Sequence, residues 1–253
     1  MKSVINFNMP RKSGRIFIGT SGWNYNHWKG VFYPESLTAK EWFAYYREKF
    51  DTVEINNTFY NLPALNVFKN WKRQAPAGFT YAVKANRYIT HMKKLKNPGS
   101  ALKKFFSGID CLKGSLGPVL YQLPPHWGCN TERLKEFIEK LPRDKFHVFE
   151  FRNDSWFTKE VFKILDSHNV SFCVHDMPYV KCPENTVGKI AYLRLHGAAE
   201  AYCGGYPTKT LKKWAGWINA QAKNRDVYVY FNNDAEGHAP EDAAKLKKLL
   251  AIG

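Results

Sequence analysis

Eight short segments with alternating apolar and polar residues recur along the chain, separated by stretches with helical spacing. Alternation with a period of two is typical of a β-strand that has one face in a core. Strands that alternate with helices favour right-handed crossovers and a parallel sheet. Eight such units in 253 residues predict an α/β fold, a single (β/α)8 TIM barrel. The expected strands are residues 15–23, 52–60, 79–87, 117–125, 147–157, 170–178, 190–197 and 226–234.

The segments between the strands predict the outer helices. These are expected at about residues 39–49, 64–74, 101–112, 132–141, 159–169, 210–223 and 241–252. Thr38 is a good N-cap for the first of them. Residues 179–189 contain too many Pro and Gly residues for a full helix, so an irregular or missing helix is expected after strand six. An open doubly wound sheet would need a GxGxxG turn after strand one, and "GTSGW" is not that motif.

Two regions are expected: a flexible basic extension over residues 1–14 and one barrel domain over residues 15–253. The extension has no apolar h-region of a secretory signal, and no apolar run has membrane-spanning length. Five cysteines, an odd number without a CxxC pair, indicate reduced thiols. We therefore expect a cytoplasmic protein without a membrane partner, and the sequence leaves its oligomeric state open.

The chain is strongly basic, with 38 Lys and Arg residues against 22 Asp and Glu residues and a formal charge of +16. This excess favours an anionic partner, either nucleic acid or a phosphate-bearing metabolite. A lysine-coated, solvated surface would give the same count, because several of the lysines lie in or beside helical patterns. Net charge is informative about association and solubility and not about fold.

The alternation shows which side chains share a face of each strand, most clearly in residues 147–157. Phe149 and Phe151 share one face of this strand, and Glu150 and Arg152 share the other. In a barrel one strand face packs on the helices and the other fills the interior. The apolar faces expected to point outward are Val53/Ile55, Tyr81/Val83, Phe149/Phe151, Leu193/Leu195 and Val229/Phe231. Strand six is ambiguous, because either Cys173 and His175 or Val174 and Asp176 could point inward.

Polar residues then occupy the inward positions at the carboxyl ends of the strands, where barrel enzymes place their chemistry. They are Glu54, Asn56, Lys84, Gln122, Glu150, Arg152, Arg194, His196 and Asn232. The structural alternative is a self-satisfied plug of ion pairs, although apolar packing is often as stable as such a plug. Two carboxylates against three cations leave about one positive charge, which suits a carboxylate or phosphate ligand.

Several chemistries are compatible with this set. Glu54 and Glu150 could act as a carboxylate pair in hydrolase-type acid–base chemistry. Lys84 could be a base of lowered pKa or a Schiff-base former in a lyase, or it could form an ion pair with Glu54. His196 could be a general acid or a ligand anchor. The chain has no HxH or HExxH motif and no P-loop, so no metal and no cofactor are expected, although Glu54 and Glu150 with His196 could still hold a metal ion.

Loops at the same rim suggest ligands of two kinds. The loops after strands seven and eight are where barrels commonly bind phosphate, and Gly204 and Gly205 could offer backbone N–H groups there. Residues 24–29 and 86–96 mix aromatic with basic side chains, as single-stranded nucleic-acid sites do. The same residues could instead serve only to pack these loops through their own aromatic rings. If the loops bind a ligand, nucleic-acid binding is the second candidate function beside small-anion binding.

The motifs "GTSGW", "FYP", "TVEINNTFY", "VKANRYITH", "LGPVLYQLPP", "EFRNDSW", "LRLHG" and "VYVYFNN" occur in this order over about residues 16–250. Together they resemble the YecE-like family, the domain of unknown function numbered 72. The resemblance implies a TIM barrel similar to endonuclease-IV-like and xylose-isomerase-like barrels, and it brings no settled reaction.

The resemblance also implies which residues of this chain lie at the rim. They are Glu54, Asn56, Tyr60, Lys84, Gln122, Glu150, Arg152, Arg194, His196, Asn232 and Asn233. The chain departs from the family where Arg152 is followed by Asn153, since an Arg-His pair is frequent there. We expect Glu54, Lys84, Glu150 and His196 as catalytic candidates. The remaining residues, together with Asp176 at the end of strand six, are ligand-binding candidates.

Overall fold

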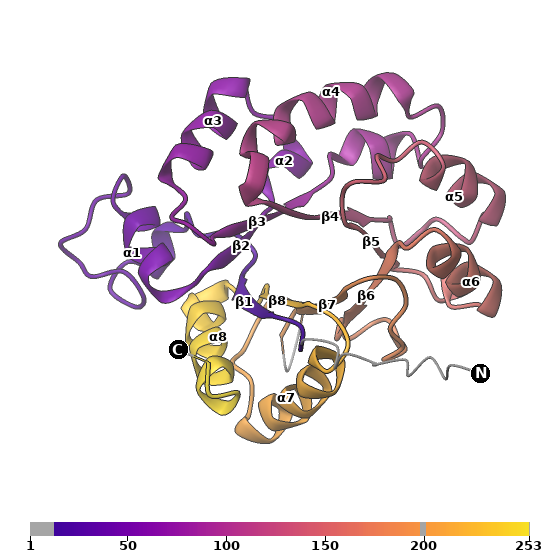
Figure 1. Cartoon of the computed structure of the whole chain (residues 1–253). Coiled ribbons are helices and arrows are strands. Elements are labelled where there is room, and N and C mark those ends of the chain that lie inside the picture. Colours follow the sequence, from indigo (N-terminus) through magenta and orange to yellow (C-terminus); the bar gives the residue numbers. More distant parts are fainter. Residues whose placement is uncertain (1–12, 198–200, 253) are drawn as a thin grey trace, which may run out of the picture.

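The alternating segments form eight parallel strands around one axis, with helices on the outside (Figure 1). This computed structural model describes residues 13–197 and 201–252. The strands are β1 Ile16–Thr20, β2 Thr52–Ile55, β3 Thr80–Lys84, β4 Leu116–Gln122, β5 His147–Glu150, β6 Ser171–His175, β7 Ala191–Leu195 and β8 Val227–Phe231. Their order is β1-β8-β7-β6-β5-β4-β3-β2, which confirms the TIM barrel. Most of the extension expected at residues 1–14 lies outside the described residues.

Helices connect the strands on the outside of the ring. They are α1 Trp42–Lys49, α2 Asn57–Tyr60, α3 Leu65–Gln74, α4 Gly99–Ile109, α5 Thr131–Ile138, α6 Lys159–Ser167, α7 Thr208–Ala222 and α8 His238–Leu249. A π-helix, Tyr88–Met92, follows β3. As expected from the Pro and Gly content, the described segment between β6 and β7 contains no helix. No described helix combines the length and the apolar character needed to cross a membrane.

The first helix corrects the sequence prediction, because α1 begins at Trp42 and not at residue 39. The side chain of Thr38 donates to Glu41 Oε2 at 2.7 Å, and the Thr38 N–H donates to the same oxygen at 2.8 Å. Thr38 thus begins a turn that leads directly into α1, and Glu41 is the N-cap of the helix. The one-turn helix α2 and the π-helix were not predicted, because each is too short to show a helical period.

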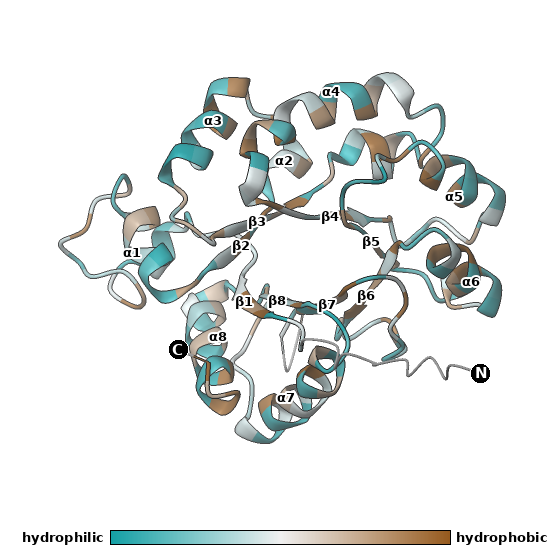
Figure 2. Cartoon of the chain, in the orientation of Figure 1, coloured by the Kyte–Doolittle hydropathy of each residue, from teal (hydrophilic) through white to brown (hydrophobic). Residues whose placement is uncertain are grey.

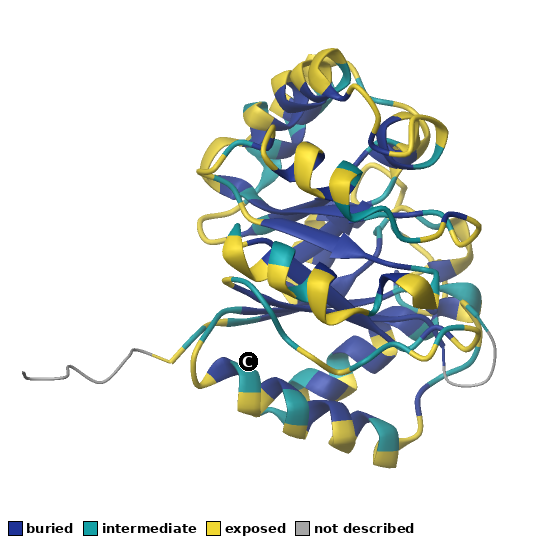
Figure 3. Cartoon of the chain, turned by 90° about the vertical axis from the view of Figure 1, so that its right-hand side faces the viewer, coloured by how far each residue is buried: buried dark blue, intermediate teal, exposed yellow. Residues whose placement is uncertain are grey.

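Burial separates the strand faces into an outer and an inner layer. The outward residues predicted on β2, β3, β5, β7 and β8 all lie in the large apolar cluster shared with the helices. The inner apolar cluster consists of Phe17, Ala82, Leu120, Val148, Cys173, Ile190, Tyr192, Tyr228 and Tyr230. Cys173 and, two residues on, His175 therefore point inward on β6. The strands are buried except at some of their ends, whereas the helices alternate hydrophobic and hydrophilic stretches and expose their outer faces (Figures 2 and 3).

Strands β1 and β2 close the ring through side chains and an isolated bridge between Ser21 and Glu54. The hydroxyl of Tyr46, on α1, accepts the Thr20 N–H at 3.0 Å and donates to the Thr52 carbonyl at 3.0 Å. A Cβ atom on Gly19 would lie 2.2 Å from that same carbonyl oxygen. Glycine and the tyrosine hydroxyl therefore let the two strands meet at this seam.

Candidate functional site

Three charged side chains from three strands meet inside the barrel. Arg194, on β7, donates through NH1 to Glu150 Oε2 on β5 and through NH2 to Glu54 Oε1 on β2, both at 2.7 Å. All three residues have an exposed fraction of 0%. Each occupies an inward position near the carboxyl end of its strand, so the structure brings these predicted residues together. The arrangement forms a buried ion triad of Glu54, Arg194 and Glu150.

Both carboxylate oxygens of Glu54 have partners. Oε1 accepts from Ser21 Oγ at 2.6 Å in addition to Arg194, and Oε2 accepts from the hydroxyl of Tyr192 at 2.6 Å. Ser21 directly follows β1, and Tyr192 lies two residues before Arg194 on the same strand face. This saturation fixes the Glu54 carboxylate in place and leaves it poorly suited to act as a mobile proton acceptor.

Glu150 is held in the same way on the opposite side of Arg194. Its Oε1 accepts from Gln122 Nε2 at 3.0 Å and from Arg152 Nε. Burial opposes ionisation, but Arg152 and Arg194 outweigh it and hold the pKa of Glu150 well below its usual value. Glu150 is therefore an anion that anchors two guanidinium groups.

The ring of His196 connects Arg152 to Asn232. Arg152 NH2 lies 3.1 Å from His196 Nε2, and Asn232 Nδ2 lies 3.1 Å from His196 Nδ1. A guanidinium can only donate, so Nε2 must accept and Nδ1 must carry the proton. The Asn232 amide is then better oriented with its oxygen toward Nδ1–H. Burial, Arg152 and Arg194 lower the pKa of His196 well below its usual value, so the ring is neutral and positions Arg152.

Asp176, after β6, organises the chain that follows β7. Its Oδ1 accepts the His196 backbone N–H at 2.6 Å, and its Oδ2 accepts from the Tyr206 hydroxyl. Burial raises the pKa of Asp176 to about 6, against the opposing effect of the Tyr206 and His196 hydrogen bonds. The Tyr206 hydroxyl also accepts the Gly197 N–H at 2.7 Å. Asp176 thus fixes both ends of a loop whose residues 198–200 lie outside the described part.

Lys84 differs from the other charged groups of the rim. It is half-buried at the end of β3, and its Nζ lies 4.2 Å from the centroid of the Phe59 ring. Among the described residues, no carboxylate oxygen lies within 4.0 Å of Nζ, so the ion pair with Glu54 considered from the sequence does not form. Burial and the charge of Arg194, partly offset by Glu150 and Glu54, lower the pKa of Lys84 to about 7.

Other predicted residues lie apart from this cluster. Tyr60, on α2, is 65% exposed. Asn233 turns away from the mouth and donates to Asp242 Oδ2 at 2.9 Å and to the Gly204 carbonyl at 3.0 Å. Asn56 is half-buried, and its buried Oδ1 has no partner in the described part of the chain.

Sequence reasoning missed Ser21, Tyr192 and Phe59 as members of the site. The alternation of β7 places Tyr192 on the same face as Arg194, so this signal was present in the sequence. Ser21 gives no such signal, because its contact with Glu54 depends on how the ring closes between β1 and β2. The described residues contain no group of three or more His, Cys, Asp or Glu side chains that could hold a metal ion.

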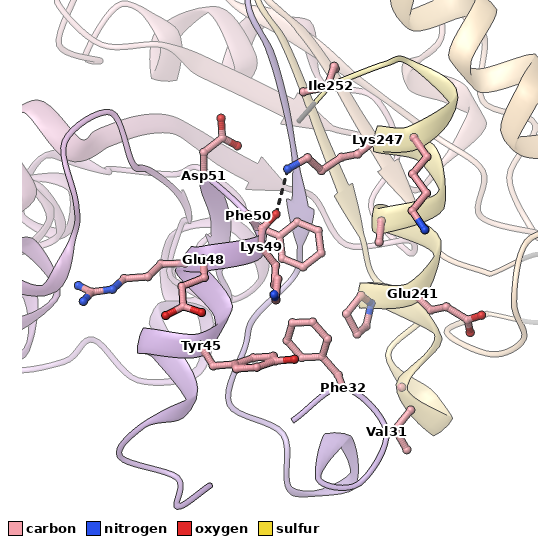
Figure 4. A pocket seen from close by; sticks show the side chains of 15 residues that line it. Val31, Phe32, Tyr45, Glu48, Lys49, Phe50, Asp51, Glu241, Lys247 and Ile252 are labelled. Carbon is pink, nitrogen blue, oxygen red and sulfur yellow. Dashed lines mark hydrogen bonds between the residues drawn. The ribbon is translucent and has the colours of Figure 1, made fainter. Parts of the chain in front are cut away.

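Large hollows in the described part of the chain also lie away from the polar cluster. One, of about 850 Å³, lies between α1 and α8, where Phe32, Tyr45 and Phe50 contribute rings (Figure 4). Another, of about 940 Å³, lies at the opposite end of the barrel and is lined by segments that precede β5, β6 and β7, including Arg143 and Lys145. We place the candidate site at the carboxyl-end rim because the inward polar residues converge there, and chemistry in this fold is located at that end.

Comparison with known proteins identifies similar chains over nearly the whole length. A family model described as "Protein of unknown function DUF72" matches residues 17–253. The UPF0759 protein YunF of Bacillus subtilis is 24% identical over 278 aligned residues, which cover 94% of this chain and 95% of YunF. The crystal structure of a DUF72 family protein from Thermotoga maritima has a TM-score of 0.84 and 30% identity, covering 94% of this chain and 99% of that one. A DUF72 family protein from Enterococcus faecalis, at 18% identity and a TM-score of 0.80, shares the fold over 94% of this chain and 96% of its own.

Proposed function

We propose that this chain, which belongs to the DUF72 family of proteins of unknown function, binds a small carboxylate- or phosphate-bearing molecule at the carboxyl-end mouth of its barrel. The observation that carries the proposal is the position of Lys84. In the described part of the rim, Arg152 and Arg194 each contact a carboxylate, whereas Lys84 has none within 4.0 Å. An anion bound at Lys84 would supply the missing partner.

The neighbours of Lys84 support a polar ligand. Arg152 is held by Glu150 and His196 with only 9% of its side chain exposed, so its guanidinium is preorganised at the mouth. Gln122 and Asn232 are half-buried beside it. Preorganised donors bind an anion at a lower entropic cost than mobile surface side chains.

The same geometry favours lyase-type chemistry over hydrolysis by a carboxylate pair. Glu54 and Glu150 both hold Arg194, so neither is free to transfer a proton to a ligand. His196 is neutral, with both ring nitrogens bonded. Lys84 is the remaining catalytic candidate: its Nζ lies over the Phe59 ring and forms no ion pair within the described part of the chain.

Ligand-induced stabilisation tests the proposal. Inorganic phosphate and pyruvate, compared with chloride at constant ionic strength, should raise the melting temperature by about 2–4 °C for each kcal/mol of binding free energy. Lys84→Met should abolish the rise. Arg143→Met, in the basic hollow at the other end of the barrel, is the matched control and should retain it. Loss of the rise in Arg143→Met, or no rise in the unmodified protein, would contradict the proposal.

One observation favours nucleic acid as a second candidate partner. The loop after β3 exposes four basic residues beside exposed aromatic and apolar side chains. They are Arg87, Lys93, Lys94 and Lys96, with Tyr88 at 43%, Met92 at 66% and Tyr60 at 65% exposure. Basic groups track phosphates, and exposed rings stack on bases.

Fluorescence anisotropy with single- and double-stranded oligonucleotides across a salt series tests this candidate. The combined variant Lys93→Gln, Lys94→Gln and Lys96→Gln should weaken binding and reduce the salt slope by about two to three phosphate contacts. The same number of changes on α4 and α5, Lys103→Gln, Lys104→Gln and Lys135→Gln, controls for net charge. Equal weakening by both sets, or no binding at low salt, would eliminate a specific role for the loop.

A further inference from the structure

Lys84 has no counter-ion in the part of the chain that the structure describes, although Glu54 and Glu150 lie in the same interior. Both carboxylates form ion pairs with arginines. Glu54 and Glu150 each lie 2.7 Å from Arg194, and Glu150 also accepts from Arg152. Ser21, Tyr192 and Gln122 fill further acceptor positions of the two carboxylates. A lysine placed for structural charge balance would be paired with one of them.

Burial beside other cations makes the amine of Lys84 easier to deprotonate than an exposed one, although its contact with the Phe59 ring favours the charged form. Its Nζ lies 4.2 Å from the centroid of the Phe59 ring, and the ring of His91 packs on Phe59 from the π-helix, with centroids 5.0 Å apart. Burial and Arg194 lower the pKa of Lys84 to about 7, so about half of the amine is unprotonated at neutral pH. Desolvation beside other cations is how reactive lysines are activated.

We infer that Lys84 forms an imine with a carbonyl compound that carries a carboxylate or phosphate, such as a 2-oxo acid or a phosphorylated aldehyde or ketone. This inference rests on the proposed anion site and names the substrate class for it. Arg152 would hold the acidic group together with the positively charged imine nitrogen of Lys84, because its guanidinium is fixed at the mouth by Glu150 and His196.

The step needs no oxidant or reductant. The unprotonated Nζ adds to the carbonyl carbon, forming a C–N bond while the carbonyl oxygen becomes a hydroxyl. A proton then reaches that hydroxyl, which leaves as water, and the nitrogen becomes a protonated imine. In sum, one amine, one carbonyl and one proton give one iminium ion and one water molecule.

Reductive trapping tests the inference. The full chain is incubated with sodium cyanoborohydride and, in separate arms, with pyruvate, glyoxylate, dihydroxyacetone phosphate, glyceraldehyde 3-phosphate or the uncharged dihydroxyacetone. Hydride converts the iminium ion to a stable secondary amine, which intact-mass measurement and peptide mapping locate. At neutral pH we expect labelling of Lys84 at least about tenfold above that of an exposed lysine, because far more of its amine is unprotonated. The oxo-acid and phosphate arms show which acidic group is preferred, and dihydroxyacetone should label Lys84 poorly.

Variants separate Lys84 from the surface lysines. Lys84→Arg and Lys84→Met should both lose the adduct, whereas Lys103→Arg, a change of an exposed lysine on α4, should retain it. Peptide mapping of the unmodified protein identifies the site even if one Lys84 variant does not fold. Labelling of Lys84 no faster than that of surface lysines in every arm would overturn the imine. If phosphate still raised the melting temperature in that case, anion binding at the rim would stand without it, and if it did not, both proposals would fall.

Discussion

The guanidinium of Arg194 lies 2.7 Å from the carboxylate of Glu54 across the barrel interior, although the two residues are 140 positions apart in the chain. The same guanidinium reaches Glu150 at 2.7 Å. Arg194 therefore joins β2, β5 and β7 from inside, where β-sheet hydrogen bonds cannot connect them. Through Glu150 the triad also holds the more accessible Arg152.

Removing the central cation should destabilise the protein strongly. Arg194→Met leaves two buried carboxylates without their shared partner, and breaking a buried ion pair in this way costs about 3–5 kcal/mol. Urea unfolding measures the loss. The triple variant Arg194→Met, Glu54→Gln and Glu150→Gln should recover part of it, because no uncompensated charge remains. Arg73→Met, an exposed change on α3, should shift the free energy of unfolding by no more than about 0.5 kcal/mol. A similarly small effect of Arg194→Met would show that the triad is not an important stabilising contact.

Replacing Lys84 should increase the stability of the protein, in contrast to the replacement of Arg194. Its pKa falls from 10.5 in the unfolded chain to about 7 in the folded protein, so the unfolded chain binds more protons between these values. Stability therefore rises with pH across that window, and the full cost of charging the buried amine is present below pH 7. Lys84→Met should raise the free energy of unfolding at pH 7 by about 1–4 kcal/mol and remove the slope.

Urea unfolding at several pH values between 7 and 10 measures both effects. Lys103→Met, an exposed change, provides the comparison for a lysine in solvent. A Lys84→Met variant that is less stable than the unmodified protein would contradict this prediction. It would mean that the contacts of the amine stabilise the fold by more than its burial destabilises it.

Asp176 should make the stability of the protein depend on pH in the acidic range. Its folded pKa of about 6 lies above the unfolded value of 3.8, so the folded protein holds this proton more tightly. The contribution of Asp176 to stability is therefore complete below about pH 3.8 and is lost as pH rises through 6. Relative to Asp176→Asn, the unmodified protein should lose stability between these values. The pKa of Glu150 is lowered, so its contribution to stability has the opposite pH dependence. Because both proteins contain Glu150, this contribution cancels in the difference between their free energies of unfolding. Asp154→Asn, an exposed change, should show no such difference, and a flat difference for Asp176→Asn would refute the assignment.

The convergence of Glu54, Lys84, Glu150 and Arg194 could be predicted because it depends on two regular properties. A period of two assigns each side chain to a strand face, and parallel strands bring all carboxyl ends to one rim. The ambiguous facing of β6 could not be decided in this way, since Cys173 and Val174 are similarly apolar. The neighbouring inner residues settle it.

Partners within the rim could not be predicted, because they depend on distances between strands that no local pattern encodes. The sequence left Lys84 either paired with Glu54 or free, and the outcome was decided by Tyr192 and Ser21, which satisfy Glu54 together with Arg194. Asn233 continues the outward-facing alternation of Val229 and Phe231, so its side chain contacts Asp242 on α8 and not the mouth of the barrel.

The hydroxyl of Tyr46 should be a strong determinant of barrel closure, since it bridges β1 and β2 in place of ladder hydrogen bonds. In Tyr46→Phe the Thr20 N–H and the Thr52 carbonyl each lose a buried partner, and Thr20 Oγ1 loses a contact at 2.9 Å. Leaving such groups unsatisfied costs about 1–3 kcal/mol, which urea unfolding should detect. Amide hydrogen exchange should also accelerate at Thr20 more than at the centre of β8. Tyr228→Phe is the matched control, because its buried ring lies in the inner cluster and its hydroxyl makes no hydrogen bond to a described residue. Equal effects of the two substitutions would mean that burial of the ring, and not the bridging hydroxyl, is what holds the seam together.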